Sequence, residues 1–345
     1  MMGIALVRSG KRALSFAIAA GFGVAAMACS SAGGRPAEAT QPPAAAGQAN
    51  APAAAAVTNP RYKFAMVTHG APGDTFFDII RKGSAAAAAK DNVEFLYSSD
   101  DSGPKQAQLV EAAINQKVDG LIVTLAVPDA LESVVKKAVA AGIPVVTINA
   151  GEEFSFKDGA LGHFGQNEDV AGQAAGEQLN SMGIKKVICV VQQQGQVQLE
   201  ARCGGVQKTF KGALDKLYVT GTNMPDVKSR ITASLQSDKS IEAVLTLAAP
   251  IALTAVEAVK DAASSAKVVT FDMNPELVPA LKAGDVQFAI DQQPYLQGYL
   301  GVDSLWLYKT NANVLGGGKP VFTGPAIVTK DTVAQIEEYA KRGTR

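Results

Sequence analysis

The stretch KFAMVTHGAPGDTFFDIIRKG, residues 63–83, decides the fold of this chain. It begins with a short apolar run, 63–68, which is typical of a buried strand. A turn containing Gly70 and Gly73 follows, and Asp74 is a good N-cap for the helical pattern after it. The stretch therefore predicts a strand, a turn and a helix, which is the start of a β-α-β unit.

The same pattern continues along the chain. Seven further apolar runs are predicted strands, at 93–98, 120–125, 145–149, 186–191, 243–248, 267–272 and 286–291. Helical patterns lie between them, for example at 104–117, 129–142 and 251–263. Alternating strands and helices predict parallel sheets with right-handed crossovers, buried on both faces. Because so many units exceed one sheet, we expect an α/β fold with two doubly wound parallel-sheet lobes, the first with four strands up to Asn149 and the second starting near Gln166.

The composition excludes several partners. The 345 residues carry 32 basic and 32 acidic side chains, so the formal net charge is zero. A neutral chain without basic runs gives no sign of binding nucleic acid or an anionic membrane surface. We therefore expect no nucleic-acid partner. We also expect the protein to be a monomer.

The first 60 residues predict export and an anchor. Basic residues at 8–12 precede a 16-residue apolar stretch, 13–28, which has the form of a signal peptide (1–28) and is short for a membrane span. Residues 26–29, AMAC, resemble a bacterial lipobox, although Ala26 replaces the usual leucine. Ordinary cleavage near Ala28 is the alternative.

The segment after Cys29 favours the lipid anchor. Residues 30–57 are mostly Ala, Pro, Gly, Ser and Gln, which bury too little apolar surface to fold. We expect residues 29–60 to be an Ala/Pro-rich tether with lipidated Cys29 at its start. The folded part is then held on the outer face of the cytoplasmic membrane, at the cell surface or in the periplasm.

The turn after the first strand indicates the kind of ligand. In open α/β sheets ligands bind beyond the carboxyl ends of the strands, where this turn lies. The turn has neither glycine pattern of a phosphate-binding loop. It carries Asp74, Phe76 and Phe77 instead. The alternative is that Asp74 only caps the helix and that both phenylalanine rings belong to the core. We expect this of one of the two rings. An aromatic wall beside a carboxylate suits a sugar, whose C–H face stacks on a ring.

Polar residues follow the other predicted strands as well. They are Thr124, Asn149, Gln192–Gln194, Asp272 and Asp291–Gln292. Each alone is typical of a cap or a solvated loop. Together they predict a polar binding cleft.

At this point the chain resembles a known family, the periplasmic binding proteins for simple sugars of the ribose- and galactose-binding type, which serve ABC importers. The resemblance covers residues 61–345. It is carried, in order, by the segments 73–83, 140–150 (AAGIPVVTINA), 163–179 (HFGQNEDVAGQAAGEQL), 199–205 (LEARCGG), 268–276 (VVTFDMNPE) and 289–299 (AIDQQPYLQGY). It implies a type I periplasmic binding protein fold.

The resemblance also implies roles for individual residues. Phe76 and Phe77 form the aromatic wall, and Asp74 and His69 bond ligand hydroxyls. Asn149 stands where the family often has an aspartate. Arg202, Asp272 and Gln292 match polar ligand contacts, and Thr124 and Gln194 complete the expected set.

Two positions depart from the ribose-binding pattern. Ala150 replaces an arginine and Ala248 replaces an asparagine, so another aldose, a ketose or an acyclic polyol fits as well as ribose. Gln193, Gln194 and Glu200 are candidates for replacement contacts.

The family's fold implies a three-segment hinge near 163–166, 291–293 and 321–324. We therefore expect an N-terminal lobe of residues 61–163 plus 293–321 and a C-terminal lobe of residues 164–292 plus 322–345. Closure of the lobes around the ligand is the usual motion of such proteins.

Cysteine and histidine usage adds one cross-link and no metal. Cys189 and Cys203 lie beyond the membrane, where disulfides persist, and we prefer a disulfide over two buried thiols. His69 and His163 lack Cys or His partners at metal-binding spacing. No metal and no cofactor are expected.

These observations predict a binding protein that captures a neutral simple sugar or polyol and delivers it to an ABC permease and its ATPase. An enzyme is disfavoured because no activated nucleophile or metal accompanies Asp74 and Asp272. A sugar-responsive repressor with the same two-lobed fold needs an N-terminal DNA-binding domain. In this chain the signal peptide and the tether occupy that place. A sensory protein that presents a sugar-like signal to a receptor remains the alternative.

Overall fold

Strand β1 (Lys63–Thr68) and helix α1 (Thr75–Lys90) form within the stretch that predicted them. The structure is a computed structural model that describes residues 60–345. The predicted signal peptide, Cys29 and the tether up to residue 59 lie outside the described residues. Asp74 caps α1 as expected, because its side chain accepts a hydrogen bond from the backbone N–H of Phe76.

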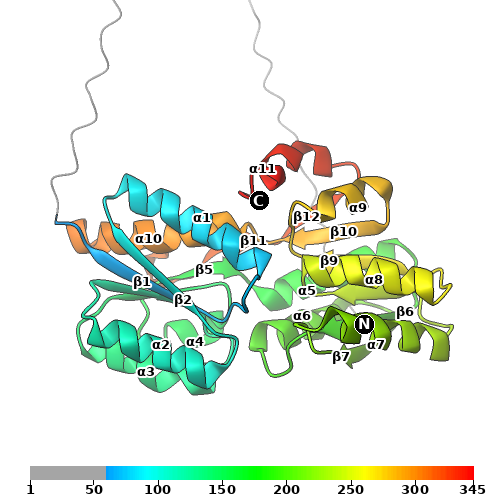
Figure 1. Cartoon of the computed structure of the whole chain (residues 1–345), viewed down its shortest axis with the longest axis horizontal. Helices are drawn as coiled ribbons and strands as arrows, with labels where there is room; N and C mark the ends of the chain where they lie inside the picture. Colours follow the sequence, from blue (N-terminus) through cyan, green and yellow to red (C-terminus); the bar gives the residue numbers. More distant parts are fainter. Residues whose placement is uncertain (1–59) are drawn as a thin grey trace, which may run out of the picture. The chain divides into compact units, whose positions relative to one another are not determined.

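The first sheet has six parallel strands in the order β11-β5-β4-β3-β1-β2. The remaining strands are β2 (Glu94–Ser99), β3 (Gly120–Val123), β4 (Val145–Ile148), β5 (His163–Gln166) and β11 (Val321–Gly324). Helices α1 and α10 (Pro294–Asn311) cover one face; α2 (Gly103–Asn115), α3 (Pro128–Ala140) and the short α4 (Glu152–Ser155) cover the other (Figure 1). Each face of the sheet has its own apolar core.

The second sheet also has six strands, in the order β12-β10-β9-β8-β6-β7, and only β12 is antiparallel. The strands are β6 (Lys186–Val191), β7 (Ala213–Tyr218), β8 (Ala243–Thr246), β9 (Lys267–Phe271), β10 (Val286–Asp291) and β12 (Ala326–Thr329). The helices are α5 (Glu168–Ser181), α6 (Val197–Thr209), α7 (Met224–Ser237), α8 (Ala249–Asp261), α9 (Leu277–Ala283) and α11 (Glu337–Lys341). Short 3-10 turns occur at Leu315–Gly318 and Val333–Gln335. Two apolar cores again flank the sheet.

The predicted fold class, two parallel-dominated α/β lobes, is confirmed. The four strands predicted up to Asn149 are present as β1–β4, but the first sheet also contains β5 and β11, which were not predicted. Both have only four residues and no long apolar run. The prediction also missed β7, an edge strand whose side chains are half-buried or exposed and which therefore lacks the apolar signal of a central strand.

The chain passes between the sheets after β5, after β10 and after β11. The predicted lobe boundaries at 163/164 and 321/322 therefore fall too early, inside β5 and β11. The third boundary, at 292/293, falls between β10 and α10. None of the helices within residues 60–345 is long and apolar enough to cross a membrane.

Candidate ligand-binding site

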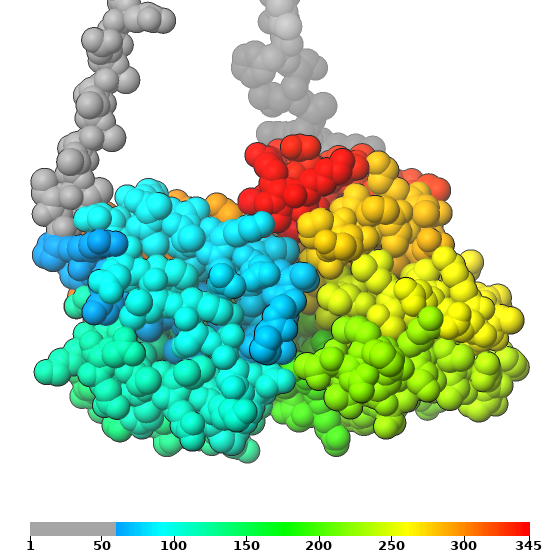
Figure 2. All heavy atoms as spheres, viewed as in Figure 1, coloured from blue at the N-terminus to red at the C-terminus, as the bar shows by residue number. Residues whose placement is uncertain are grey.

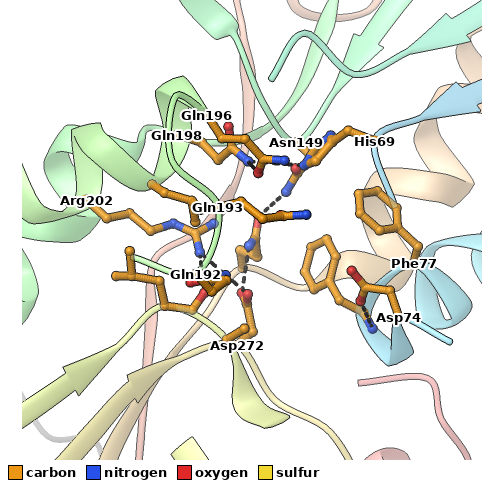
Figure 3. A pocket seen from close by; sticks show the side chains of 15 residues that line it. His69, Asp74, Phe77, Asn149, Gln192, Gln193, Gln196, Gln198, Arg202 and Asp272 are labelled. Atoms are coloured by element: carbon orange, nitrogen blue, oxygen red, sulfur yellow. Dashed lines mark hydrogen bonds and ion pairs between the residues drawn. The ribbon is translucent and has the colours of Figure 1, made fainter. Parts of the chain in front are cut away.

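A cavity lies where the carboxyl ends of strands from the two sheets face each other. Its empty space is about 400 Å³, counting the open mouth. Eight predicted site residues line it: His69, Asp74, Phe76, Phe77, Asn149, Arg202, Asp272 and Gln292. Figure 3 shows polar side chains of both lobes converging on this space, and Figure 2 shows the lobes meeting along a seam.

Two predicted contacts do not line the cavity. Thr124 is fully buried behind His69, where its hydroxyl holds the imidazole. Gln194 is exposed in the turn with Gly195, which has a left-handed φ of +85°. Glu200, the replacement candidate, forms an ion pair with Lys216 on the surface of α6.

Sequence reasoning missed several lining residues. Gln196 and Gln198, at the start of α6, line the cavity together with Leu199 and Leu247. Ala248, named above as a departure from the ribose-binding pattern, lines it too. Gln192 and Gln193 line it from the end of β6, as the polar strand ends had indicated. The run of five glutamines between 192 and 198 is the sequence signal that points to this wall.

The aromatic wall comes from the first turn of α1. Phe77 is 4% exposed and packs edge-on against His69, at 5.0 Å between ring centres. Phe76 is half-buried and meets Phe77 edge-on at 5.3 Å. Both rings line the cavity, and Phe77 is also part of the buried core, whereas Phe76 is only half-buried. Burial raises the pKa of Asp74, the cap of the same helix.

Hydrogen-bond partners surround the His69 side chain. Thr124 Oγ1 accepts from the backbone N–H of His69 (3.0 Å) and from Gln106 Nε2 (3.1 Å), and it lies 2.8 Å from His69 Nδ1. On the other side of the ring, Nε2 lies 3.1 Å from the amide nitrogen of Gln198, which also donates to Gln196 Oε1 (2.7 Å). Burial, helped by the charge of Arg202, lowers the pKa of His69 to about 3, so the ring is neutral.

Arg202 is the buried positive charge at the centre of the cavity wall formed by the second lobe, called the second wall below. It lies in the second turn of α6 and is 2% exposed. Its Nε and Nη2 donate to Glu168 Oε2 (2.7 Å) and Oε1 (3.0 Å), and Nη1 donates to the carbonyl of Leu247 (3.0 Å). Glu168 was not predicted, since acidic residues are common in the first turn of any helix, where they complement the helix dipole. The two charges cancel.

Close helix packing sets the Arg202–Glu168 geometry. Helices α5 and α6 approach backbone to backbone at Gly172 and Gly205. A Cβ on Gly205 would lie 2.2 Å from the carbonyl oxygen of Asp169, and one on Gly172 would lie 2.2 Å from that of Arg202. A disulfide between Cys189 and Cys203 ties α6 to β6, which confirms the predicted pair.

A chain of hydrogen bonds connects the strand ends of both lobes. Asn149 Nδ2 donates to Gln292 Oε1 (2.9 Å), and Gln292 Nε2 donates to Asp272 Oδ1 (2.6 Å). Asp272 Oδ2 lies 3.5 Å from Arg202 Nη1. Burial raises the pKa of Asp272 to about 7, against the opposing attraction of Arg202. The cavity therefore offers many neutral donors and acceptors and little net charge.

The lobes also touch directly beside the cavity. Besides the Asn149–Gln292 and His69–Gln198 contacts, the backbone N–H of Val197 donates to the carbonyl of Ala126 (3.0 Å). These contacts join the ends of first-sheet strands to the start of α6 and the end of β10. The cavity is a site shared by two lobes, which is the architecture of a solute-binding protein.

The family profile of the periplasmic binding protein domain matches residues 64–312. The chain therefore belongs to the periplasmic binding protein family, whose members are solute-binding proteins and not enzymes. The type I fold that the sequence resemblance implied is confirmed.

Solved structures agree with this assignment. The chain is 56% identical to a carbohydrate transporter from Acidothermus cellulolyticus 11B, solved in complex with myo-inositol, with a TM-score of 0.82 over 83% of this chain and 100% of that one. It is 26% identical to an ABC transporter solute-binding protein from Burkholderia graminis C4D1M, in complex with D-arabinose, with a TM-score of 0.70 over 78% and 96% of the two chains.

A curated relative is the xylose/arabinose-binding protein XylF of Sulfolobus acidocaldarius, 26% identical over 217 residues. The match covers 58% of this chain and 54% of XylF, so the chain spans about half the length of that relative.

Proposed function

We propose that this protein captures a neutral cyclic polyol or simple sugar between its lobes and delivers it to an ABC import permease, with myo-inositol as the first candidate ligand. The cavity between the sheets is the observation that carries the proposal. Its charged side chains are paired with one another, and its other polar groups are amides, a neutral imidazole and one capping carboxylate.

This lining favours a neutral ligand over a phosphorylated one. A sugar phosphate needs a surplus of positive charge. The Nε and Nη2 groups of Arg202 already donate to the carboxylate of Glu168, which neutralises the guanidinium. Hydroxyl groups of a polyol both donate and accept, and the cavity supplies both kinds of partner. The half-buried ring of Phe76 supplies an apolar surface for the C–H face of the ligand ring.

The choice of myo-inositol rests on the relative from Acidothermus cellulolyticus, which was solved with that cyclitol and matches along its whole length. A cyclitol has no anomeric centre and carries a hydroxyl on each ring carbon. Many short amide contacts around the ring, rather than one strong anchor, suit such a molecule.

We propose roles for the lining residues on the same basis. Asp272 and Gln292 hold ligand hydroxyls from the second lobe, and Asp74, His69 and Asn149 hold others from the first. Arg202 uses its remaining N–H groups on the ligand. Closure by a hinge at the three crossings between the sheets completes the site.

The cellular setting follows from the N-terminal residues. A signal peptide and a lipid on Cys29 would hold the protein on the outer face of the cytoplasmic membrane, as a monomer beside its permease and ATPase. Cys29→Ser should move the protein from the membrane fraction to the soluble fraction. Unchanged retention in membranes would contradict the anchor. The described relatives are transport proteins, which favours import over the sensory alternative.

Calorimetry against cyclitols, pentoses, hexoses and alditols tests the ligand. Asp272→Ala should lower the affinity about 30- to several-thousand-fold, because a partner of a buried hydrogen-bonded charge is removed. Gln193→Ala should lower it about 3- to 10-fold, whereas its exposed neighbour Gln194→Ala should leave it unchanged. Preference for a phosphorylated sugar, or equal affinity in all variants, would contradict the proposed site.

A further inference from the structure

The ligand cavity continues into a second hollow. This outer pocket has about 860 Å³ of empty space, counting its opening. Six residues line both the cavity and the outer pocket, so the two are continuous: Asp74, Phe76, Gln192, Gln193, Ala248 and Asp272.

The chemistry of the lining changes between the two spaces. Beyond the shared residues, the outer pocket is walled by Pro72, Met224, Pro250, Ile251 and Met273. Pro72 comes from the loop before α1, and the others come from the first turns of α7 and α8 and from the end of β9, so both lobes contribute. Thr75 and Thr222 are the polar side chains among the unshared lining residues, and the others are apolar or glycine. The wall matches an apolar group.

The passage between the spaces lies beside Phe76 and Ala248. Both are half-buried and line both spaces. Ala248 carries only a methyl group, and its extended backbone (φ −158°, ψ 148°) leads directly into α8. A larger side chain at this position would narrow the passage. A ligand whose ring is held by the polar groups of the cavity can therefore extend a substituent into the outer pocket.

We propose that the outer pocket is a subsite for an apolar substituent, so that the protein binds O-alkyl and O-aryl ethers of its neutral polyol as well as the parent compound. The inference rests on the proposed function and narrows its ligand class. The ring occupies the polar cavity, and the alkyl or aryl group lies between Met224, Ile251 and Pro72.

A homologous series of ligands tests the subsite. Calorimetry compares the parent cyclitol or sugar with its mono-O-methyl, ethyl, propyl and benzyl ethers at each ring position. For at least one position the affinity should rise about fourfold for each added methylene, the value for a CH₂ group leaving water for an apolar environment. A pocket that only serves as a water-filled entrance gives no increase along the series.

Variants locate the effect. Thr222 is exposed and lines the outer pocket without lining the cavity. Thr222→Trp should reduce the affinity for the propyl and benzyl ethers at least tenfold and leave the affinity for the parent within about twofold. Met224→Ala should widen the pocket and weaken the dependence on chain length. The matched control is Lys239→Trp, which adds the same side chain at an exposed position after α7.

The outcomes separate this inference from the proposed function. Binding of the parent with no gain for any ether at any position overturns the subsite and leaves the proposed function intact. If the affinity rises along the ether series but is unaffected by Thr222→Trp and Met224→Ala, the subsite is also overturned, because the substituent then lies elsewhere. Absence of binding to every parent compound overturns the proposed function and the subsite with it.

Discussion

Replacing Glu168 by glutamine tests whether the buried ion pair with Arg202 organises the second wall of the cavity. The side chains of Arg202 and Glu168 are 3% and 9% exposed, and two charge-assisted hydrogen bonds join them. Glu168→Gln keeps the size of the side chain but leaves the guanidinium without its main counter-ion. Breaking a buried pair in this way costs about 3–5 kcal/mol of unfolding free energy.

The cost should appear as a lower melting temperature. One kcal/mol corresponds to roughly 2–4 °C for a domain of this class, so we expect a decrease of roughly 6–20 °C in a calorimetric scan at pH 7. The matched control is Glu200→Gln, since Glu200 also pairs from near the start of α6 but with the more exposed Lys216. A surface pair contributes about 0–1 kcal/mol, so this variant should melt close to the wild type.

A double variant separates stability from binding. Glu168→Leu combined with Arg202→Met removes both charges, and replacing a buried pair by apolar side chains is often neutral or stabilising. The double variant should therefore regain most of the lost stability but bind no ligand. If Glu168→Gln melts no lower than Glu200→Gln, or if the double variant still binds ligand with wild-type affinity, the reasoning about this wall is wrong.

Three further predictions concern other parts of the chain. Gly205→Ala should destabilise the protein by about 1–3 kcal/mol in urea unfolding because its Cβ would collide with the carbonyl of Asp169. Gly204→Ala, one residue earlier in the same helix and with open space around its Cβ, should be neutral or stabilising by up to about 1 kcal/mol; equal effects would refute the close packing of α5 on α6. Burial lowers the pKa of His163 to about 4. Between pH 6.5 and pH 4, His163 is therefore protonated in the unfolded chain but neutral in the folded protein. The contribution of His163 to the free energy of unfolding is fully present above pH 6.5 and falls by about 3 kcal/mol as the pH decreases to 4. His163→Gln should remove this part of the pH dependence of stability, and identical pH profiles of variant and wild type would contradict it. Breaking the Cys189–Cys203 disulfide with a paired alanine variant should cost roughly 3 kcal/mol in the chain-entropy model, and an unchanged urea midpoint would show that the cross-link does not stabilise the fold.

The fold was predictable because central parallel strands carry a strong signal. Strand β6 is apolar after Lys186, and β10 is apolar apart from Gln287 and Asp291; the predicted bounds of both strands agree with the structure. Strand β7 escaped prediction because an edge strand has solvent on one side and needs no apolar run. Strands β5 and β11 are short and owe their place to neighbours far away in the sequence, which local patterns do not report.

The cavity was predictable to the extent that strand ends define it. Asn149 and Asp272 follow strands directly, and both adopt left-handed backbone conformations (φ 62° and 67°) that turn the chain at the sheet edge. Thr124 follows a strand too, yet its side chain faces inward and holds His69. The sequence does not show which way a side chain points at a strand end. Gln198 and Glu168 come from helix starts, where polar residues commonly cap the helix or complement its dipole whether or not a ligand binds there.

The late position of α10 in the chain affects the order in which the protein can fold. Helix α10 packs against α1 so closely that a Cβ on Gly298 would lie 2.1 Å from the carbonyl of Ile80. Strand β11, which completes the first sheet, follows α10. As the polypeptide emerges from its N-terminus, the first sheet therefore lacks β11 and has one face covered by α1 alone until all of the second sheet except β12 has appeared. The second lobe has nearly all of its strands before the first lobe is closed, so the lobe that begins first is the one that matures later.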